Sequence, residues 1–279
     1  MTSCAARPEL DARCDGGGIE AVDGAALADF AAEYGTSLPP VAIVIAAYNE
    51  EDGIGAVIQA LPPTVAGLET ATIVVVDGSA DDTAAIARKH GALVADIPQN
   101  RGQGAALRLG YRIARTGGAR YIVTTDADGQ YDAADIETVL TPLINGHADF
   151  VSGSRILGHQ ETYDKVRRAG VHVFARLVTL LTRHRVTDTS FGLRAIRADL
   201  TAHITLNQPQ YQASELLISV IMNGYRATEV PATIHLRTAG TTKKGRNLTY
   251  GYRYAKVVLG TWHREHQRNR HERRNRRNR

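Results

Sequence analysis

Two carboxylates at positions 126 and 128 form the pattern in this sequence that most directly suggests chemistry. Asp126 and Asp128 follow the apolar run 121–125, where an irregular turn can aim both carboxylates toward one point. Two carboxylates held close together repel each other unless a cation lies between them. Oxygen ligands suit Mg²⁺ or Mn²⁺, and Mg²⁺ usually takes one or two carboxylates together with phosphate oxygens of the substrate. The pattern therefore predicts a divalent-cation site, and its alternative is an ordinary Asp-x-Asp turn.

Other polar segments follow other apolar runs. Asp77 opens the segment 77–83 (DGSADDT), and a carboxylate at a strand tip can accept a hydrogen bond from the N–H edge of a nucleobase. Part of this segment is typical of capping chemistry, with Ser79 or Asp81 as a helix N-cap. The segment 100–104 (NRGQG) has glycines that would let backbone amides approach a diphosphate. It lacks the third glycine of a dinucleotide fingerprint and the Gly-Lys-Ser/Thr of a P-loop.

The elements that must position these residues alternate along the chain. Runs that are apolar at nearly every position are typical of strands buried on both faces, and helical patterns lie between them. This alternation predicts an α/β fold with a mostly parallel sheet flanked by helices. Ligands bind beyond the carboxyl ends of the strands in such sheets, so we expect the polar segments to meet at one edge. The strand runs are 41–47, 72–76, 92–97, 121–125 and 150–151, and the helical patterns are 51–60, 82–90, 103–116 and 133–145.

Composition excludes several classes of protein. The chain has 279 residues, of which 43% are hydrophobic and 22% charged, and this excludes fibrous and wholly disordered proteins. Its two cysteines, Cys4 and Cys14, are too few for a secreted disulfide framework, so we expect a cytoplasmic protein. No run of 18 apolar residues is present, so we do not expect an integral membrane protein.

Charge is distributed unevenly and suggests how the chain is organised. Residues 1–37 are acidic, and we expect a mobile extension with a short helix near 21–34. Residues 38–262 are expected to form one folded domain, in which the alternation stops after residue 155. Residues 263–279 are rich in arginine, and such a block is usually disordered, although it can also bind an anionic membrane surface. Nucleic-acid binding is disfavoured because no aromatic platform, zinc-finger spacing or basic recognition helix accompanies the charge.

Six motifs occur together in an order that is far more specific than any one of them. The chain resembles family 2 glycosyltransferases of the GT-A fold over about residues 40–260, and within that family it is similar to dolichyl- and polyprenyl-phosphate sugar synthases. Two positions depart from the pattern, because Val76 stands where many relatives have aspartate and Gln103 where many have lysine. The motifs are 41–50 (VAIVIAAYNE), 76–83 (VDGSADDT), 100–110 (NRGQGAALRLG), 126–130 (DADGQ), 153–155 (GSR) and 188–195 (DTSFGLRA).

The resemblance implies an enzyme that moves a sugar from a nucleoside-diphosphate sugar, with inversion in one in-line displacement. Residues 38–155 would bind this donor, with Asp77 near the base, and residues 156–262 would bind the acceptor. A cation at the metal site would stabilise the negative charge on the departing diphosphate. The implied donor-site residues are Tyr48, Glu50, Asp77, Gln103 and Arg155, and the implied ligands of Mg²⁺ or Mn²⁺ are Asp126, Asp128 and Gln130, with Asp128 and Asp188 counted as catalytic.

Two acidic residues in the second half bear on the acceptor. Asp188 is the family position for a base or an acceptor-site carboxylate. A sugar hydroxyl would need such a base, whereas a phosphate acceptor is already largely ionised near neutral pH. The alternative is a structural carboxylate that bonds to loop amides or pairs with Arg194. Glu215, in the expected helix 212–223, matches another acidic family position and has a similar alternative as a salt-bridged residue.

Two basic segments are also candidates for acceptor or phosphate binding. Arg168 belongs to an expected amphipathic helix, which is either an ordinary surface helix or one that lies on an anionic bilayer. Arg237 and Lys243 flank Gly240 in a segment that resembles the family's R-x-x-G-x-S-K pattern, and a mobile loop with these cations could bind phosphate. The basic positions of the helix are Lys165, Arg168, His172, Arg176 and Arg183.

We therefore expect a GT-A glycosyltransferase that uses Mg²⁺ or Mn²⁺ and a polyprenyl-phosphate acceptor, with possible peripheral contact at the cytoplasmic membrane face. The first alternative is the same chemistry on a soluble hydroxyl acceptor, such as a natural product or glycan. A nucleotidyltransferase is a weaker alternative, because it would need a glycine-rich basic segment after the first strand, where this chain has AAYNEE. A binding module without catalytic activity is the last alternative.

Overall fold

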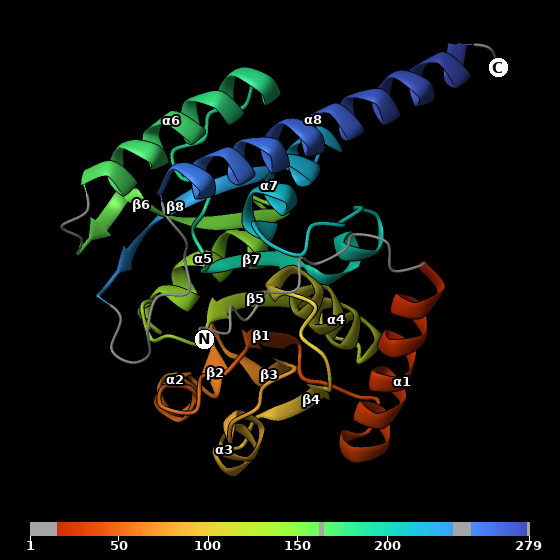
Figure 1. The fold of residues 1–279 in the computed structure, drawn as a ribbon, viewed down its shortest axis with the longest axis vertical. Helices are drawn as coiled ribbons and strands as arrows, with labels where there is room; N and C mark the ends of the chain where they lie inside the picture. Colours follow the sequence, from red (N-terminus) through yellow and green to blue (C-terminus); the bar gives the residue numbers. More distant parts are fainter. Residues whose placement is uncertain (1–15, 162–164, 237–246, 278–279) are drawn as a thin grey trace, which may run out of the picture.

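The computed structural model describes residues 16–161, 165–236 and 247–277. Its strands are β1 (Val41–Ala47), β2 (Thr64–Val65), β3 (Leu68–Asp77), β4 (Leu93–Ile97), β5 (Tyr121–Asp126), β6 (Phe150–Gln160), β7 (Arg194–Arg197) and β8 (Ala227–Ile234). Its helices are α1 (Gly16–Tyr34), α2 (Ile54–Ala60), α3 (Thr83–Lys89), α4 (Gln103–Thr116), α5 (Asp135–Ile144), α6 (Lys165–Thr182), α7 (Gln212–Met222) and α8 (Asn247–Arg277), with a 3₁₀ turn at Ala198–Ala202. Figure 1 shows the sheet through the middle of the molecule with helices on both sides.

The sheet is mostly parallel, as the alternation of strands and helices predicted. β1 pairs in parallel with β3 and β5, and β3 pairs in parallel with β4. β7 runs antiparallel between β5 and β6, and β6 pairs in parallel with β8. Within the described residues the order is β2-β3-β1-β5-β7-β6-β8, with β4 beside β3. The carboxyl ends of β1, β3 and β5 therefore lie together at one edge.

Both faces of β1 are buried, which explains why its sequence is apolar at every position. Val44 faces a core that includes residues of α4, while Ile43 faces a core that includes residues of α5. Gly110 allows α4 to approach β1 closely, since a Cβ at that position would lie 2.3 Å from Cγ1 of Val44. This close contact fixes the position of α4, and with it the segment 100–104 that leads into the helix.

β6 is longer than expected, because the apolar run predicted only residues 150–151. The strand continues to Gln160 through small and polar residues and pairs with β8 along most of that length. A Cβ at Gly153 would lie 2.5 Å from Cε1 of Phe191, so the strand needs a residue without a side chain there. Tight packing requires small residues in this part of β6. Such residues give no apolar pattern from which the strand could be predicted.

α1 includes the short helix expected near 21–34 and begins five residues earlier, at Gly16. The helix packs against β4 and α4, and Phe30 is buried in the core that covers this face of the sheet. The rings of Phe30 and Tyr34 lie 4.9 Å apart. Leu27, Phe30 and Tyr34 recur at helical spacing, so one side of α1 is apolar although the segment as a whole is acidic.

α8 corrects the expectation of a disordered tail at 263–279. The helix continues to Arg277, and Figure 1 shows its last turns extending away from the rest of the molecule. Glu265 is fully buried and forms ion pairs with Arg264, at 3.1 Å, and with Arg268, at 2.6 Å. Two arginines of a block whose composition suggests solvation therefore neutralise a buried carboxylate. Ser219 and Asn223 also donate to Glu265, at 3.4 and 3.3 Å, and these bonds hold α8 against α7.

α6 has the expected helical conformation from Lys165 to Thr182. Arg183 lies beyond its end and has a left-handed backbone conformation, with φ of 58°, so this residue does not extend the basic face of the helix. Among the described residues, no helix combines the length and apolar character needed to cross a bilayer.

Candidate active site

Hydrogen bonds connect the segments that follow β1 and β3 at the edge of the sheet where these strands end. The amide of Asn49 donates to Oγ of Ser79, at 2.9 Å, and the side-chain Oδ1 of Asn49 accepts from the amide of Ala80, at 2.9 Å. The amide of Glu50 donates to Oγ1 of Thr83, at 2.9 Å. The N-cap position of α3 belongs to Asp82, whose side chain makes no capping hydrogen bond, but the expected capping role of Asp81 is present, because its Oδ1 accepts from the amide of Thr83, at 3.2 Å.

These bonds place two expected donor-site residues beside the segment 77–83. Tyr48 is 39% exposed and Glu50 is half-buried, directly after β1. Asn49, which connects them, has a left-handed backbone with φ of 50° and forms the bonds that join the two segments. Sequence reasoning did not single out Asn49, although asparagine is the residue type best suited to such a conformation.

Asp77 is buried at the tip of β3 and is 2% exposed. Its Oδ2 accepts from the amides of Arg101, at 2.9 Å, and Gly102, at 2.6 Å. Its Oδ1 is buried and has no hydrogen-bond partner among the described residues. Burial raises the pKa of Asp77, and the two amides oppose this shift. One oxygen therefore holds the loop before α4, and the other can accept a hydrogen bond from a bound molecule.

The glycines of the segment 100–104 have a different role from the one expected. The amide of Gly104 donates to the carbonyl oxygen of Pro209, at 2.8 Å. A Cβ at Gly104 would lie 2.0 Å from the carbonyl oxygen of Gln208, and one at Gly102 would lie 2.6 Å from that of Pro209. These glycines make room for the loop 207–209. The amides at 101, 102 and 104 are already paired within the protein, so these three are not available to a diphosphate.

Gln103 and Asp126 are brought together although they are distant in sequence. Nε2 of Gln103 donates to Oδ1 of Asp126, at 3.1 Å, across the edge between α4 and β5. Asp128 is 6% exposed, and its Oδ1 accepts from the amide of Gln130, at 3.2 Å. The side chain of Gln130 donates to the carbonyl oxygen of His235, at 3.0 Å, and so ties this turn to the end of β8.

Tyr131 and Gly192 border Asp126 on its other side. The amide of Gly192 donates to the hydroxyl oxygen of Tyr131, at 2.8 Å, and a Cβ at Gly192 would lie 2.6 Å from Oδ2 of Asp126. Burial, followed by the nearby negative charge of Asp126, raises the pKa of Tyr131 well above its usual value. Only glycine fits at 192, which gives the motif 188–195 a direct structural link to the expected metal site.

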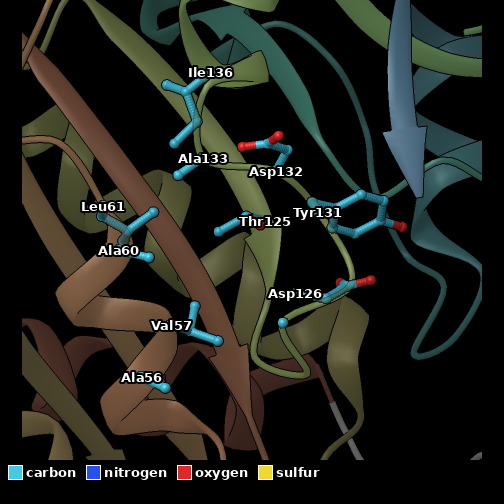
Figure 2. A pocket seen from close by; sticks show the side chains of 11 residues that line it. Ala56, Val57, Ala60, Leu61, Thr125, Asp126, Tyr131, Asp132, Ala133 and Ile136 are labelled. Atoms are coloured by element: carbon cyan, nitrogen blue, oxygen red, sulfur yellow. The ribbon is translucent and has the colours of Figure 1, made fainter. Parts of the chain in front are cut away.

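A cavity of about 180 Å³ lies beside Asp126, as Figure 2 shows. Its walls come from α2 and from the segment between β5 and α5, and most of its lining side chains are apolar. A charged diphosphate would find few partners there. The cavity is lined by Ala56, Val57, Ala60, Leu61, Thr125, Asp126, Gly129, Tyr131, Asp132, Ala133 and Ile136.

The residues at the end of β5 fit a cation only if a substrate completes its coordination shell. Asp126 and Asp128 provide two carboxylates, and within the described residues no group of three or more His, Cys, Asp or Glu side chains could hold a metal ion. Mg²⁺ commonly has one or two protein carboxylates together with substrate phosphates. The arrangement therefore suits a cation that binds together with a diphosphate and does not suit one held by the protein alone.

Asp188 and Arg155 form a buried ion pair. Nε of Arg155 lies 2.6 Å from Oδ2 of Asp188, while Oδ1 of Asp188 accepts from the amide of Ser190, at 3.0 Å. Asp188 has no exposed surface, and Arg155 is 8% exposed. The partner of Asp188 is therefore Arg155, not Arg194, which instead bonds to Gly192 and Gln212.

Glu229 supports this pair and was not anticipated from the sequence. Its two carboxylate oxygens accept from the amides of Thr187, at 2.7 Å, and Asp188, at 2.8 Å. Burial raises the pKa of Glu229, and these bonds oppose the shift. The sequence signal that could have indicated this role is a glutamate within the strand 227–234, because an acidic residue in a strand usually has a specific partner.

Glu215 is buried and supports the loop 207–209. It has no exposed surface, and its carboxylate accepts from the amides of Asn207, at 2.8 Å, and Gln208, at 2.9 Å. Nη1 of Arg264 in α8 lies 2.9 Å from the same carboxylate. This matches the salt-bridged alternative for Glu215, because its oxygens hold the loop 207–209 instead of facing an acceptor.

Of the remaining expected residues, the structure describes Arg168 alone. Arg168 is exposed on α6, which packs against α7 and α8. Arg237 and Lys243 lie outside the described residues. The structure therefore gathers the expected donor and metal residues from the first half of the chain, together with Arg155 and Asp188, whereas Arg168, the expected acceptor cation that it describes, lies on α6.

Comparison with known proteins gives a family assignment. The model for glycosyl transferase family 2 matches residues 42–205. A dolichyl-phosphate hexose transferase of Haloferax volcanii is 38% identical over 203 residues, which are 73% of this chain and 86% of that protein. A UDP-N-acetylglucosamine--dolichyl-phosphate N-acetylglucosaminyltransferase of Methanococcus voltae is 30% identical over 234 residues, which are 76% of this chain and 91% of that protein.

Solved structures agree at the level of the fold. Glucosyl-3-phosphoglycerate synthase from Mycobacterium tuberculosis, in complex with Mn²⁺, UDP-glucose and phosphoglyceric acid, has a TM-score of 0.64 and 20% identity, covering 92% of this chain and 86% of that chain. At this identity the likeness shows the fold alone, which is the expected GT-A arrangement. With the family match over most of the sheet and its edge, the chain belongs to glycosyl transferase family 2 and is a glycosyltransferase.

Proposed function

We propose that this glycosyltransferase moves a sugar from a nucleoside-diphosphate sugar to a polyprenyl phosphate. The observation that carries the choice of acceptor is the state of Asp188. A hydroxyl nucleophile needs a base to take its proton, yet this carboxylate has no exposed surface and both its oxygens are bonded within the protein. A phosphate acceptor needs no such base, because its second pKa is about 6. Relatives named for dolichyl-phosphate acceptors support the same choice.

The donor site of this proposal is the edge where β1, β3 and β5 end. Asp77 presents one buried oxygen to an N–H group of the base, and Tyr48 and Glu50 lie beside the same segment. Asp126 and Asp128 would hold Mg²⁺ or Mn²⁺ against the diphosphate, with Gln103 and Gln130 bonded to the same turn. The cation supplies positive charge where the leaving diphosphate becomes negative.

The proposed reaction is one displacement with inversion. A phosphate oxygen of the acceptor attacks the anomeric carbon, the bond from that carbon to the donor diphosphate breaks, and the nucleoside diphosphate leaves with the electron pair. Arg155 would face the donor while Asp188 fixes its orientation through their 2.6 Å ion pair. Asp188 thus serves as a positioning residue in this proposal.

The acceptor would reach the protein from a membrane surface, for which α6 and α8 provide a docking face. The two helices lie side by side (Figure 1), with the rings of Phe174 and Tyr254 4.5 Å apart. We define the α6–α8 face by Val173, Leu180, Tyr252 and Leu259, whose exposed fractions are 60%, 77%, 72% and 47%.

Helical spacing puts these side chains on the outer side of both helices. Val173 and Leu180 lie opposite buried Val178 in α6, and Tyr252 and Leu259 lie opposite buried Tyr254 in α8. Exposed basic residues accompany them, among them Arg168, His172 and Arg176 in α6 and Arg253 and Lys256 in α8. Apolar side chains among cations match the boundary of an anionic bilayer, where the former enter the acyl region and the latter meet lipid phosphates.

The function is tested by incubating the purified protein with UDP-, GDP- and dTDP-sugars, Mn²⁺, and either a polyprenyl phosphate or the matching polyprenol. We expect release of nucleoside diphosphate and formation of a lipid-linked sugar with the phosphate only. Mass spectrometry of the lipid product is the measurement. Equal transfer to the polyprenol, or transfer to a soluble hydroxyl compound instead, would contradict the proposed acceptor.

The metal site gives a second prediction. Asp126→Asn and Asp128→Asn each remove one carboxylate charge, and we expect each to lower kcat by about 100-fold or more in saturating donor, because the leaving-group charge is no longer stabilised. Asp132→Asn is the matched control: its carboxylate lies a few residues away and accepts from the amide of Ala134, so near-normal turnover is expected. Chelation by EDTA, followed by titration with Mn²⁺ and Mg²⁺, measures the cation requirement directly, and unchanged turnover after chelation would contradict it.

The role of Asp188 is tested by a double-mutant cycle with Arg155. We expect Asp188→Asn and Arg155→Gln each to lower kcat/KM by about 100-fold, since the first disturbs the placement of the Arg155 guanidinium and the second removes it. The double variant should be no worse than Arg155→Gln alone, because Asp188 acts through that residue. Circular dichroism at the assay temperature checks that each variant is folded. A further large loss in the double variant, with a new dependence on pH, would instead identify Asp188 as a base.

If the α6–α8 face docks on a membrane, we expect the protein to sediment with vesicles that contain phosphatidylglycerol. We expect much less protein to sediment with vesicles of phosphatidylcholine. Replacing Val173 and Leu180 with serine should weaken binding to the anionic vesicles by about tenfold, because two apolar side chains no longer enter the bilayer. Val22→Ser changes a side chain on α1 that is 38% exposed and serves as the control. Binding that is unaffected by the double serine variant would show that another surface meets the membrane.

A further inference from the structure

An ion pair connects α1 to the loop that precedes α4. Nη1 of Arg101 lies 2.8 Å from Oδ1 of Asp23, and the two side chains are 15% and 17% exposed. The family model begins at residue 42, so this helix lies outside the part of the chain that the family match covers. The contact therefore comes from a segment that the family assignment does not explain.

The same arginine is bonded to the candidate base-binding carboxylate through its backbone. Its amide donates to Oδ2 of Asp77, at 2.9 Å, and its positive charge acts on that carboxylate. Oδ1 of Asp77 is buried without a hydrogen-bond partner among the described residues. The guanidinium of Arg101 thus lies within electrostatic reach of two carboxylates and is paired with the one in α1.

The ion pair between Arg101 and Asp23 decides whether Oδ1 of Asp77 remains available for a ligand. A mostly buried guanidinium needs a counter-charge, because burial removes most of its hydration. Without the carboxylate of Asp23, this guanidinium would be left with Asp77, a carboxylate on which its charge already acts, and the unbonded Oδ1 of Asp77 would be drawn into an ion pair. That oxygen would then no longer accept a hydrogen bond from a base.

We propose that Asp23 is a positioning residue for the donor, which holds the Arg101 side chain on α1 and leaves Oδ1 of Asp77 open to the nucleobase. This inference rests on the proposed nucleotide-sugar donor. α1 does not depend on this pair for its place on the protein, because Phe30 is buried near its other end and Glu33 pairs with Arg88 of α3, at 3.4 Å. Removal of the Asp23 charge should therefore affect binding before it affects folding.

The test is isothermal titration of UDP, GDP and dTDP, each with Mn²⁺, which requires no acceptor. For the nucleotide that the wild type binds, we expect Asp23→Asn to raise the Kd by about 5- to 20-fold. Asp23→Glu should recover most of the affinity, since it restores the charge. Glu33→Gln is the matched control, because it breaks another ion pair of the same helix and should leave the Kd unchanged.

A second-site variant separates positioning from simple stability. Asp23→Asn combined with Arg101→Gln removes the competing cation as well, so affinity should return toward that of Arg101→Gln alone. An unchanged Kd in Asp23→Asn, or an equal loss in Glu33→Gln, would overturn the inference while leaving the proposed donor intact. If the wild type binds none of the nucleotides, the proposed donor fails and the inference fails with it.

Discussion

A carboxylate that loses its water must find N–H donors within the protein, and this requirement organises the whole edge of the sheet. Each of three buried or half-buried carboxylates accepts from two successive amides of a loop and so fixes the path of that loop. Hydrogen bonds to a charged acceptor are stronger than those between neutral groups, which lets short loops keep one conformation without a large apolar core. The three are Asp77 with residues 101 and 102, Glu229 with residues 187 and 188, and Glu215 with residues 207 and 208.

Much of the fold could be predicted from the sequence, because the physical signal was local. β1 has the bounds that its apolar run indicated, since a strand buried on both faces must be apolar at each position. The ends of the chain could not be predicted in this way. Arginine-rich composition indicates solvation, and only the tertiary structure shows that Glu265 is buried among these arginines. α1 was underestimated for a similar reason, because its few apolar residues meet a core built by distant parts of the chain.

In the candidate site, too, the sequence indicated which residues are of interest but not which partners they have. Sequence identified Asp77, Asp126 and Asp188 as carboxylates of interest, and each lies near the edge or directly beneath it. It did not reveal that Asp188 pairs with Arg155 across 33 positions, or that glycines 102 and 104 accommodate the loop 207–209. Such assignments depend on the register of strands and the path of loops, which no single motif specifies. The acceptor therefore remained open at the sequence level, and our proposal of a phosphate acceptor rests on the surroundings of Asp188.

The loop 207–209 has a consequence for exchanging parts between relatives. It lies just beyond the segment that the family model matches, yet it occupies the space left by Gly102 and Gly104 and is held by Glu215, which in turn pairs with Arg264 of α8. A chimera that joins residues up to 205 of this chain to the remaining part of another enzyme would separate the glycines from the backbone they accommodate. A junction beyond residue 264 keeps that unit whole, so the structural unit extends about sixty residues past the end of the family match.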